Sequence, residues 1–116
     1  LSSEWKTCCI DAGGWTFETP MASLAMGSQV RLRVLARDVS IAVEKPDSIS
    51  IRNRLQAEVE EIAAHPSEPA YQLVKLKCPN GEGRLVSRIL RQSVTELGLH
   101  PGSQVWALVK ASAVIM

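Results

Sequence analysis

The sequence predicts an all-β protein, built as a small barrel with one short helix and preceded by part of a second such unit. Three observations carry this prediction. Apolar and polar residues alternate with period two over several short segments, as in half-buried strands. Turn signals rich in Gly, Pro and Asn separate those segments. Finally, the apolar stretch 102–116 is rich in β-branched residues and has an earlier counterpart in the chain.

That counterpart is the segment 26–41, and the likeness favours an internal duplication. Both segments contain the string Gly-Ser-Gln-Val, beginning at Gly27 and at Gly102. Behind the string, apolar residues match in order: Val34 with Val109, Ala36 with Ala111, and Val39 with Val114. A shared string followed by matching apolar positions is typical of a repeat. Two independent strands of similar composition are the alternative.

Length and composition indicate an ordinary globular chain. It has 116 residues, 46% hydrophobic and 22% charged, with a net charge of +1. This charge argues against a general nucleic-acid surface. No apolar run is long enough to cross a bilayer and no signal peptide is visible. The chain does not start with Met, so we expect a piece of a longer protein. Three cysteines without zinc-ligand spacing favour a reducing compartment.

The first 43 residues are expected to form a hairpin followed by the first copy of the repeat. Strands are predicted over 6–10 and 15–18, around a Gly13-Gly14 turn, and Pro20 ends the second one. In the repeat, alternation predicts a long strand with a buried face and a wet face. Its buried face contains Val30, Leu32 and Val34, and Arg31 and Arg33 lie on the other face. We interpret that second face as exposed to solvent; a ligand site at the two arginines is the alternative.

The second half, 48–116, has the elements of a complete barrel after a linker at Pro46. The polar patch 50–53 opens a predicted strand that alternates over 55–60. Further strands are predicted over 73–78, 85–90, 104–110 and 113–116, with a short helix around Ser93 that Gly98 and Pro101 end. A helix over 54–64 is an alternative on propensity. Five strands with one helix between the third and fourth fit an OB-like barrel.

The first half has only the closing part of such a barrel. We therefore divide the chain into a partial OB-like unit, 1–43, and a complete module, 48–116. The partial unit is expected to pack on the second half or on another copy of the chain.

An enzyme needs a convergent set of catalytic groups, and the sequence offers none. Its two histidines, His65 and His100, each lie beside a proline in a predicted turn. No phosphate-binding Gly-rich loop is present, because Gly81-Glu82-Gly83 lacks the required continuation. We expect no catalytic residue and no enzyme activity in this segment.

Hydrogen-bond donors gather instead at a few strand ends. Ser50 and Arg52 precede a predicted strand, Ser93 lies at the start of the short helix, and Lys110 lies where the last long strand breaks. Arg and Lys side chains donate and cannot accept, and hydroxyl and main-chain N–H groups also donate. This inventory suits a small, fully deprotonated dianion.

Three motifs resemble the molybdate-binding OB-fold module known as the Mop or TOBE domain. They are Ser50-Ile51-Arg52-Asn53, then Ser93 ahead of Leu97-Gly98-Leu99, and the closing run from Gly102 to Val114 that contains Lys110-Ala111-Ser112. The string from Arg31 to Ala42 resembles the segment that precedes this module in the ATPase subunit of molybdate importers. The nucleotide-binding domain of that subunit is absent from this chain.

The resemblance implies an oxyanion site for molybdate or tungstate, bound intact by hydrogen bonds, with no cofactor and no metal ligand. Its residues would be Ser50, Arg52, Asn53, Lys110, Ala111 and Ser112, with Ser93 supplied by the facing subunit. Two positions depart from the family pattern. Ile49 and Leu90 stand where a hydroxyl residue is frequent, and each lost hydrogen bond to a charged ligand costs about 1.5–3 kcal/mol.

By the same resemblance, the expected function is that of a regulatory oxyanion-binding and dimerisation domain of a molybdate ABC transporter ATPase. The partners would be a second copy, the upstream nucleotide-binding domain and, indirectly, the membrane permease. The location would be cytoplasmic, peripheral to the inner membrane. One alternative is a dimerisation module without a ligand.

Another, weaker alternative is an OB-fold nucleic-acid binder. Such proteins stack bases on aromatic side chains in a basic groove. The aromatic residues here do not cluster on one predicted strand face, so no nucleic-acid partner is expected.

Overall fold

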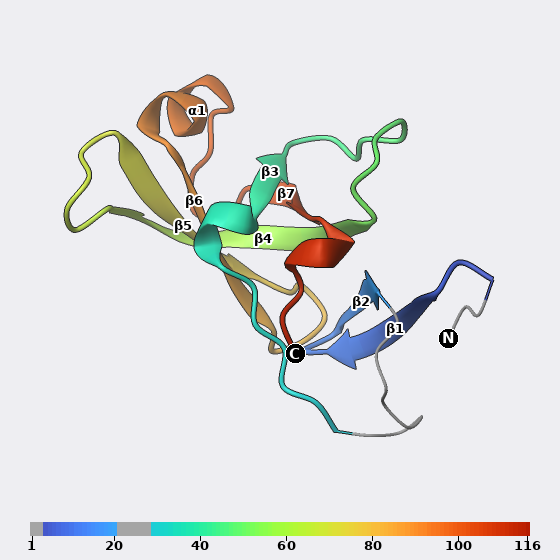
Figure 1. Ribbon diagram of the computed structural model, residues 1–116. Coiled ribbons are helices and arrows are strands. Elements are labelled where there is room, and N and C mark those ends of the chain that lie inside the picture. Colours follow the sequence, from blue (N-terminus) through green and yellow to red (C-terminus); the bar gives the residue numbers. More distant parts are fainter. Residues whose placement is uncertain (1–3, 21–28) are drawn as a thin grey trace.

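The protein consists mainly of antiparallel β-strands with one short α-helix, seen in a computed structural model that describes residues 4–20 and 29–116 (Figure 1). The predicted fold class is confirmed. The elements in chain order are β1 (Thr7–Ala12), β2 (Trp15–Pro20), the 3-10 turn η1 (Ala36–Asp38), β3 (Ser40–Ala42), β4 (Asn53–Ala64), β5 (Tyr71–Lys77), β6 (Arg84–Leu90), α1 (Arg91–Glu96), β7 (Gln104–Val109) and the 3-10 turn η2 (Ala111–Ala113).

Five strands form the main sheet in the order β3-β7-β4-β5-β6, with every neighbouring pair antiparallel. β4 organises this sheet, because its first half pairs with β7 and its second half with β5. The register shifts between Val59 and Glu61, so one extra residue bends the strand there. The alternation of buried and exposed residues along β4 shows that the strand prediction for this segment was right and the helical alternative wrong.

The two outer strands of this sheet approach each other and close it around one core. The Ser87 hydroxyl on β6 donates a hydrogen bond to the Val39 carbonyl, just ahead of β3. η1 packs against β6 at the same place. Val39, Val59, Val74, Leu76 and Val109 are among the side chains that fill the interior. Closure removes most of the free sheet edge, which suits a small β-protein.

The β1–β2 hairpin forms a separate two-stranded sheet that packs on the main one (Figure 1). The Trp15 indole donates a 2.7 Å hydrogen bond to the Gln56 carbonyl on β4, and Trp15 and Phe17 belong to the common core. At the hairpin tip, the Gly83 N–H donates to the Gly13 carbonyl at 2.8 Å. The first-half hairpin thus rests on the second half of the chain, while the exact division at 43 and 48 stays a prediction.

A buried amide fastens β2 to the start of β4. Asn53 is 3% exposed, and its side chain bonds the main chain of Glu18 at two points. Its Oδ1 accepts from the Glu18 N–H at 2.6 Å, and its Nδ2 donates to the Glu18 carbonyl at 2.9 Å. The Asn53 side chain therefore satisfies both main-chain groups of Glu18, as a paired residue on a neighbouring strand would.

The first copy of the repeat differs from the strand predicted over 27–41. Residues 27 and 28 lie outside the described residues. From residue 29 to 35 the chain forms one isolated bridge, between Arg33 and Ile115, and no ladder. The predicted alternation still holds, since Leu32 and Val34 pack against the core while Arg31 and Arg33 are exposed. The strand prediction was wrong because alternation reports burial, whereas a strand also needs a paired neighbour.

The two copies nevertheless end in the same structure. η1 and η2 occupy matching positions of the repeat, each preceded by an extended residue, with φ/ψ of −69/141 at Leu35 and −62/143 at Lys110. Each turn is closed by the same bond, from the N–H of Val39 or Val114 to the carbonyl of the first turn residue. Similar turns at matching positions support the duplication.

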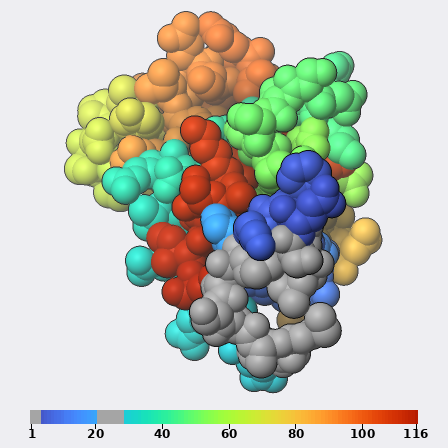
Figure 2. All heavy atoms as spheres, turned by 45° about the vertical axis from the view of Figure 1, so that its right-hand side comes forward, coloured from blue at the N-terminus to red at the C-terminus, as the bar shows by residue number. Residues whose placement is uncertain are grey.

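The residues after each turn pair with the segment that precedes the turn of the other copy. Ser40, at the start of β3, lies opposite Leu108 on β7, and Ile115 bridges Arg33. These pairings correspond under the repeat, because Ser40 matches Ile115 and Leu108 matches Arg33. Figure 2 shows the C-terminal residues running between the segment near residue 40 and the β1–β2 hairpin. The strand predicted over 113–116 is therefore wrong, and β3 takes the fifth position in the sheet.

The remaining second-half elements match their predictions closely. β5, β6 and β7 lie within two residues of the expected bounds, and the predicted short helix is α1, which contains Ser93 and ends ahead of Gly98. No helix in the described part of the chain is both long and apolar enough to span a membrane.

The contact between hairpin tips predicts a large effect of Gly13→Ala. Gly13 has φ +60, and a Cβ there would lie 2.4 Å from the Gly83 Cα. Gly98 has φ +63 but nothing near its Cβ position, so Gly98→Ala measures the conformational cost alone, about 1–2 kcal/mol. We expect Gly13→Ala to lower the free energy of unfolding by about 3 kcal/mol or more in urea titrations. Equal losses in the two variants would contradict the tip-to-tip contact.

The buried amide predicts that Asn53→Ala destabilises the protein by about 2–3 kcal/mol, because two main-chain groups of Glu18 lose their partner. The exposed side chain of Gln56 on the same strand provides a control, and Gln56→Ala should change the free energy of unfolding by less than about 0.5 kcal/mol. Thermal and urea unfolding measure both. A loss below about 1 kcal/mol for Asn53→Ala would show that β2 is held by other contacts.

Candidate functional site

The first part of the expected site is a loop end, residues 49–52, fastened to the main sheet from both sides. The Arg54 guanidinium donates a 2.9 Å hydrogen bond to the Pro46 carbonyl. The Lys45 ammonium lies 5.3 Å from the centre of the Trp106 ring, a cation–π distance. These contacts hold the loop over the junction of β4 and β7, so Ser50 and Arg52 reach the solvent at the end of this strand pair.

The register of β4 and β7 brings Arg52 and Lys110 to the same place. The ladder between the two strands ends with Asn53 opposite Val109. Arg52 directly precedes Asn53 and Lys110 directly follows Val109, and both cationic residues are exposed. The two charges therefore lie at the same end of this strand pair. Like charges repel, and an anion between them relieves that repulsion.

The η2 turn continues this surface directly after Lys110. Ala111 begins the turn, Ser112 is exposed within it, and the Ala113 N–H is already used by the Lys110 carbonyl at 2.9 Å. The matching turn of the first copy has the same backbone but reads Leu35-Ala36-Arg37-Asp38. It lacks both the lysine and the serine, so the donor set belongs to the second copy only.

Two of the expected site residues, Asn53 and Ser93, do not lie with the other donors in this chain. Asn53 is buried, and its amide is occupied by the main chain of Glu18, so within this chain it supports the site without facing it. Ser93 lies in α1, which follows β6 near the far end of β4, a whole strand away from Arg52 (Figure 1). The chain does not bring Ser93 to the other donors, so a joint site would need a second copy.

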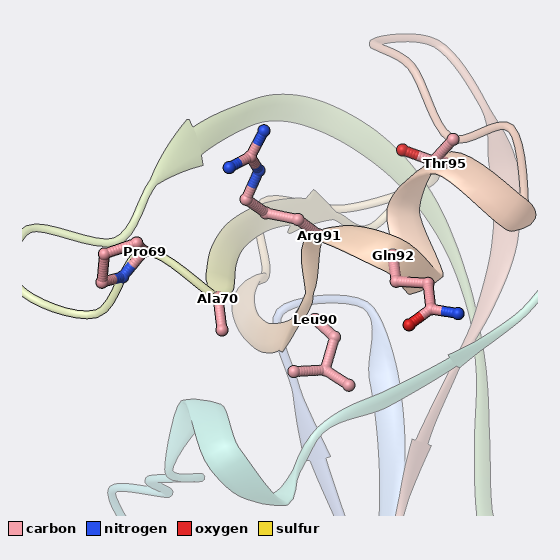
Figure 3. A pocket seen from close by; sticks show the side chains of 6 residues that line it. All are labelled: Pro69, Ala70, Leu90, Arg91, Gln92 and Thr95. Carbon is pink, nitrogen blue, oxygen red and sulfur yellow. The ribbon is translucent and has the colours of Figure 1, made fainter.

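A shallow pocket of about 390 Å³ lies at the start of α1 (Figure 3). Its lining residues are Pro69, Ala70, Leu90, Arg91, Gln92 and Thr95. The Arg91 side chain points away from Leu90 in this view, and the Gln92 amide donates to Glu96 at 2.9 Å. This pocket combines polar side chains with the exposed Leu90, and Ser93 is not among its lining residues.

The sequence reasoning missed Glu18. Its carboxylate accepts from Arg52 Nε at 3.0 Å and from the Thr7 hydroxyl at 3.2 Å. The side chains are 61% exposed for Arg52 and 23% for Glu18. Glu18 belongs to the first-half hairpin and Arg52 to the second half, so no local pattern links them. The long-range pairing of β2 with Asn53 alone brings the carboxylate to the site.

Comparison with known proteins agrees with this architecture. The TOBE domain family matches residues 49–116. The molybdenum import ATP-binding protein ModC of Brucella abortus is 44% identical over 110 residues, which are 95% of this chain and 30% of the relative. ModC 1 of Azotobacter vinelandii is 44% identical over 92 residues, 78% of this chain and 24% of the relative. The chain thus spans about a third or less of these relatives.

A solved structure shares the fold of nearly the whole chain. The cytoplasmic molybdate-binding protein ModG, crystallised with molybdate bound, superimposes with a TM-score of 0.77 and 29% identity, covering 89% of this chain and 76% of ModG. The likeness includes the first half, beyond the residues that the family match covers. By its sequence, its fold and its closing motif, this chain belongs to the TOBE domain family and is homologous to the C-terminal region of ModC, the ATP-binding protein of molybdate importers.

Proposed function

We propose that this chain is a regulatory domain of a molybdate importer ATPase and binds molybdate or tungstate at the end of the β4–β7 pair. The observation that carries the proposal is that the ladder ends at Asn53 and Val109, which leaves Arg52 and Lys110 exposed at the same end of the strand pair. The relatives named ModC and the molybdate-bound ModG support the choice of ligand. No step of this proposal is catalytic.

Donor chemistry explains how such a site selects its ligand. A tetrahedral dianion accepts hydrogen bonds at every oxygen and donates none. Arg52 and Lys110 supply charge and donors, and Ser50, Ser112 and the Ala111 main chain surround them with further donors. A protonated oxyanion would bring an O–H to these donors and lose a bond, so the fully deprotonated form is favoured.

The proposed site is completed by a second copy, which supplies Ser93 from its own α1. Arg52 and Ser93 lie at opposite ends of β4 in one chain, so two chains placed head to tail can bring them together. Binding then couples to the arrangement of the two copies. In a full-length importer this would transmit the cytoplasmic oxyanion concentration to the nucleotide-binding domains and the permease, at the inner face of the membrane.

The proposal predicts that molybdate and tungstate release binding heat with the wild-type chain, and that Arg52→Ala and Lys110→Ala each weaken binding about tenfold to a hundredfold. Each substitution removes a charge-assisted hydrogen bond worth about 1.5–3 kcal/mol. Isothermal titration calorimetry measures the change.

Arg84→Ala provides the matched control, because Arg84 is an exposed arginine paired with Glu60 at 3.3 Å on another part of the sheet. It should bind oxyanions like the wild type. Absence of heat and of a thermal shift with millimolar molybdate and tungstate would refute the sensing function.

A second candidate is a dimerisation module that binds no ion. Ile49 and Leu90 favour it, since both are exposed apolar residues, 41% and 43%, next to the two parts of the proposed site. An apolar side chain there offers contact area to a second copy and no donor to an oxyanion. Under this candidate the dimer forms equally well without ligand.

The double variant Ile49→Thr/Leu90→Thr separates these candidates. If the site binds an oxyanion, two added hydroxyls should tighten binding severalfold in calorimetry. If the two side chains serve a ligand-free contact between copies, the variant should dissociate into monomers at concentrations where the wild type is dimeric, as seen by analytical ultracentrifugation. Val43→Thr, at another exposed apolar residue, is the control for surface polarity and should do neither.

A further inference from the structure

We propose that Glu18 sets the affinity and charge preference of the oxyanion site, because its carboxylate is the resident counter-ion of Arg52. This inference rests on the proposed function and adds a residue from the first half of the chain to the site. An incoming anion would have to bind beside, or displace, a negative charge that the fold itself supplies.

The contact is built by the fold and is more than a chance surface pair. Asn53 holds the Glu18 main chain through two hydrogen bonds, at 2.6 and 2.9 Å, and Asn53 directly follows Arg52. The Glu18 backbone therefore cannot move away from Arg52 while β2 stays attached to β4. The Thr7 hydroxyl bonds the other carboxylate oxygen at 3.2 Å and limits its rotation.

The Glu18–Arg52 contact leaves donors of Arg52 available to an oxyanion but lowers the affinity for it. Glu18 takes the Nε–H of Arg52, at 3.0 Å, so the four N–H groups on the two terminal nitrogens remain available to a ligand. An oxyanion bound there would lie roughly 6 Å from the carboxylate. At that separation in a water-like dielectric, repulsion weakens a monoanion about threefold and a dianion about tenfold.

This penalty rises with ligand charge, so Glu18 would favour a monoanion over a dianion of the same shape. It would also raise the dianion concentration at which the domain responds. Such a site binds its ligand only at a high oxyanion concentration, as feedback inhibition of an importer would require.

The test compares Glu18→Gln with the wild type. Glutamine keeps an acceptor oxygen for the Arg52 Nε–H and leaves the Asn53 bonds to the main chain intact, so only the charge is removed. Molybdate serves as the tetrahedral dianion and perrhenate as the tetrahedral monoanion, both titrated by calorimetry at low ionic strength. We expect Glu18→Gln to bind molybdate about tenfold more tightly and perrhenate about threefold more tightly.

Glu61→Gln is the matched control. Glu61 is also an ion-paired glutamate, bonded to Lys75 at 2.7 Å, and lies on the distant half of β4. It makes the same change in net charge and should alter both affinities by less than twofold. Urea unfolding of each variant verifies that the fold is retained.

The outcomes distinguish this inference from the proposed function. Unchanged or weaker molybdate binding in Glu18→Gln, with the wild type binding, would overturn the role of Glu18 and leave the oxyanion site standing. Weaker binding in particular would show that the carboxylate positions Arg52 for the ligand. Equal gains for the two anions would overturn the charge-based explanation. No binding by the wild type or by either variant would overturn the oxyanion site itself.

Discussion

The residues that follow each 3-10 turn pair with the segment that precedes the other turn, and the two halves of the chain meet at these pairings. β3 completes the main sheet through β7, and Ile115 returns the contact at Arg33. The main sheet is not built from residues 48–116 alone, because its fifth strand, β3, comes from the first half of the chain. The β3–β7 pairing and the Arg33–Ile115 bridge join the two halves of the chain. Both halves contribute to one core, in which Trp15 and Phe17 lie with Val59 and Val109. Shared burial of this kind makes the halves fold as one unit.

These pairings also explain why the site lies where it does. Each copy of the repeat contains a 3-10 turn at the same position, and the turn after β7 follows directly from Lys110. β4 begins beside that turn, so the residues just ahead of β4 and just after β7 meet at one strand end. The first copy has the same turn with Leu35 in the lysine position, and this divergence leaves a single donor-rich end. The two turns thus share a backbone conformation, while the candidate donors Lys110 and Ser112 lie at the second turn.

The fold was predictable from the second half more than from the first. In β4 to β7, alternation and turn residues agree with the tertiary pairing, so local and global preferences point to the same structure. In 29–35 the same alternation led to a strand prediction that was wrong, because the segment has one bridged residue and no ladder. For the site, the sequence placed Ser50, Arg52 and Lys110 at strand ends. It could not assign Asn53 to the Glu18 main chain, since these residues meet only when β2 packs on β4.

By itself, the sequence determined the alternation of buried and exposed residues, the turns, the repeat and the motifs that link the chain to the TOBE family. These are local properties, set by side-chain polarity and by backbone preferences of a few neighbouring residues. Tertiary structure alone decided which copy completes which sheet, which amide holds β2, and which carboxylate faces Arg52. Those choices depend on contacts between segments more than thirty residues apart, and the free energy that selects them comes from closing a common core.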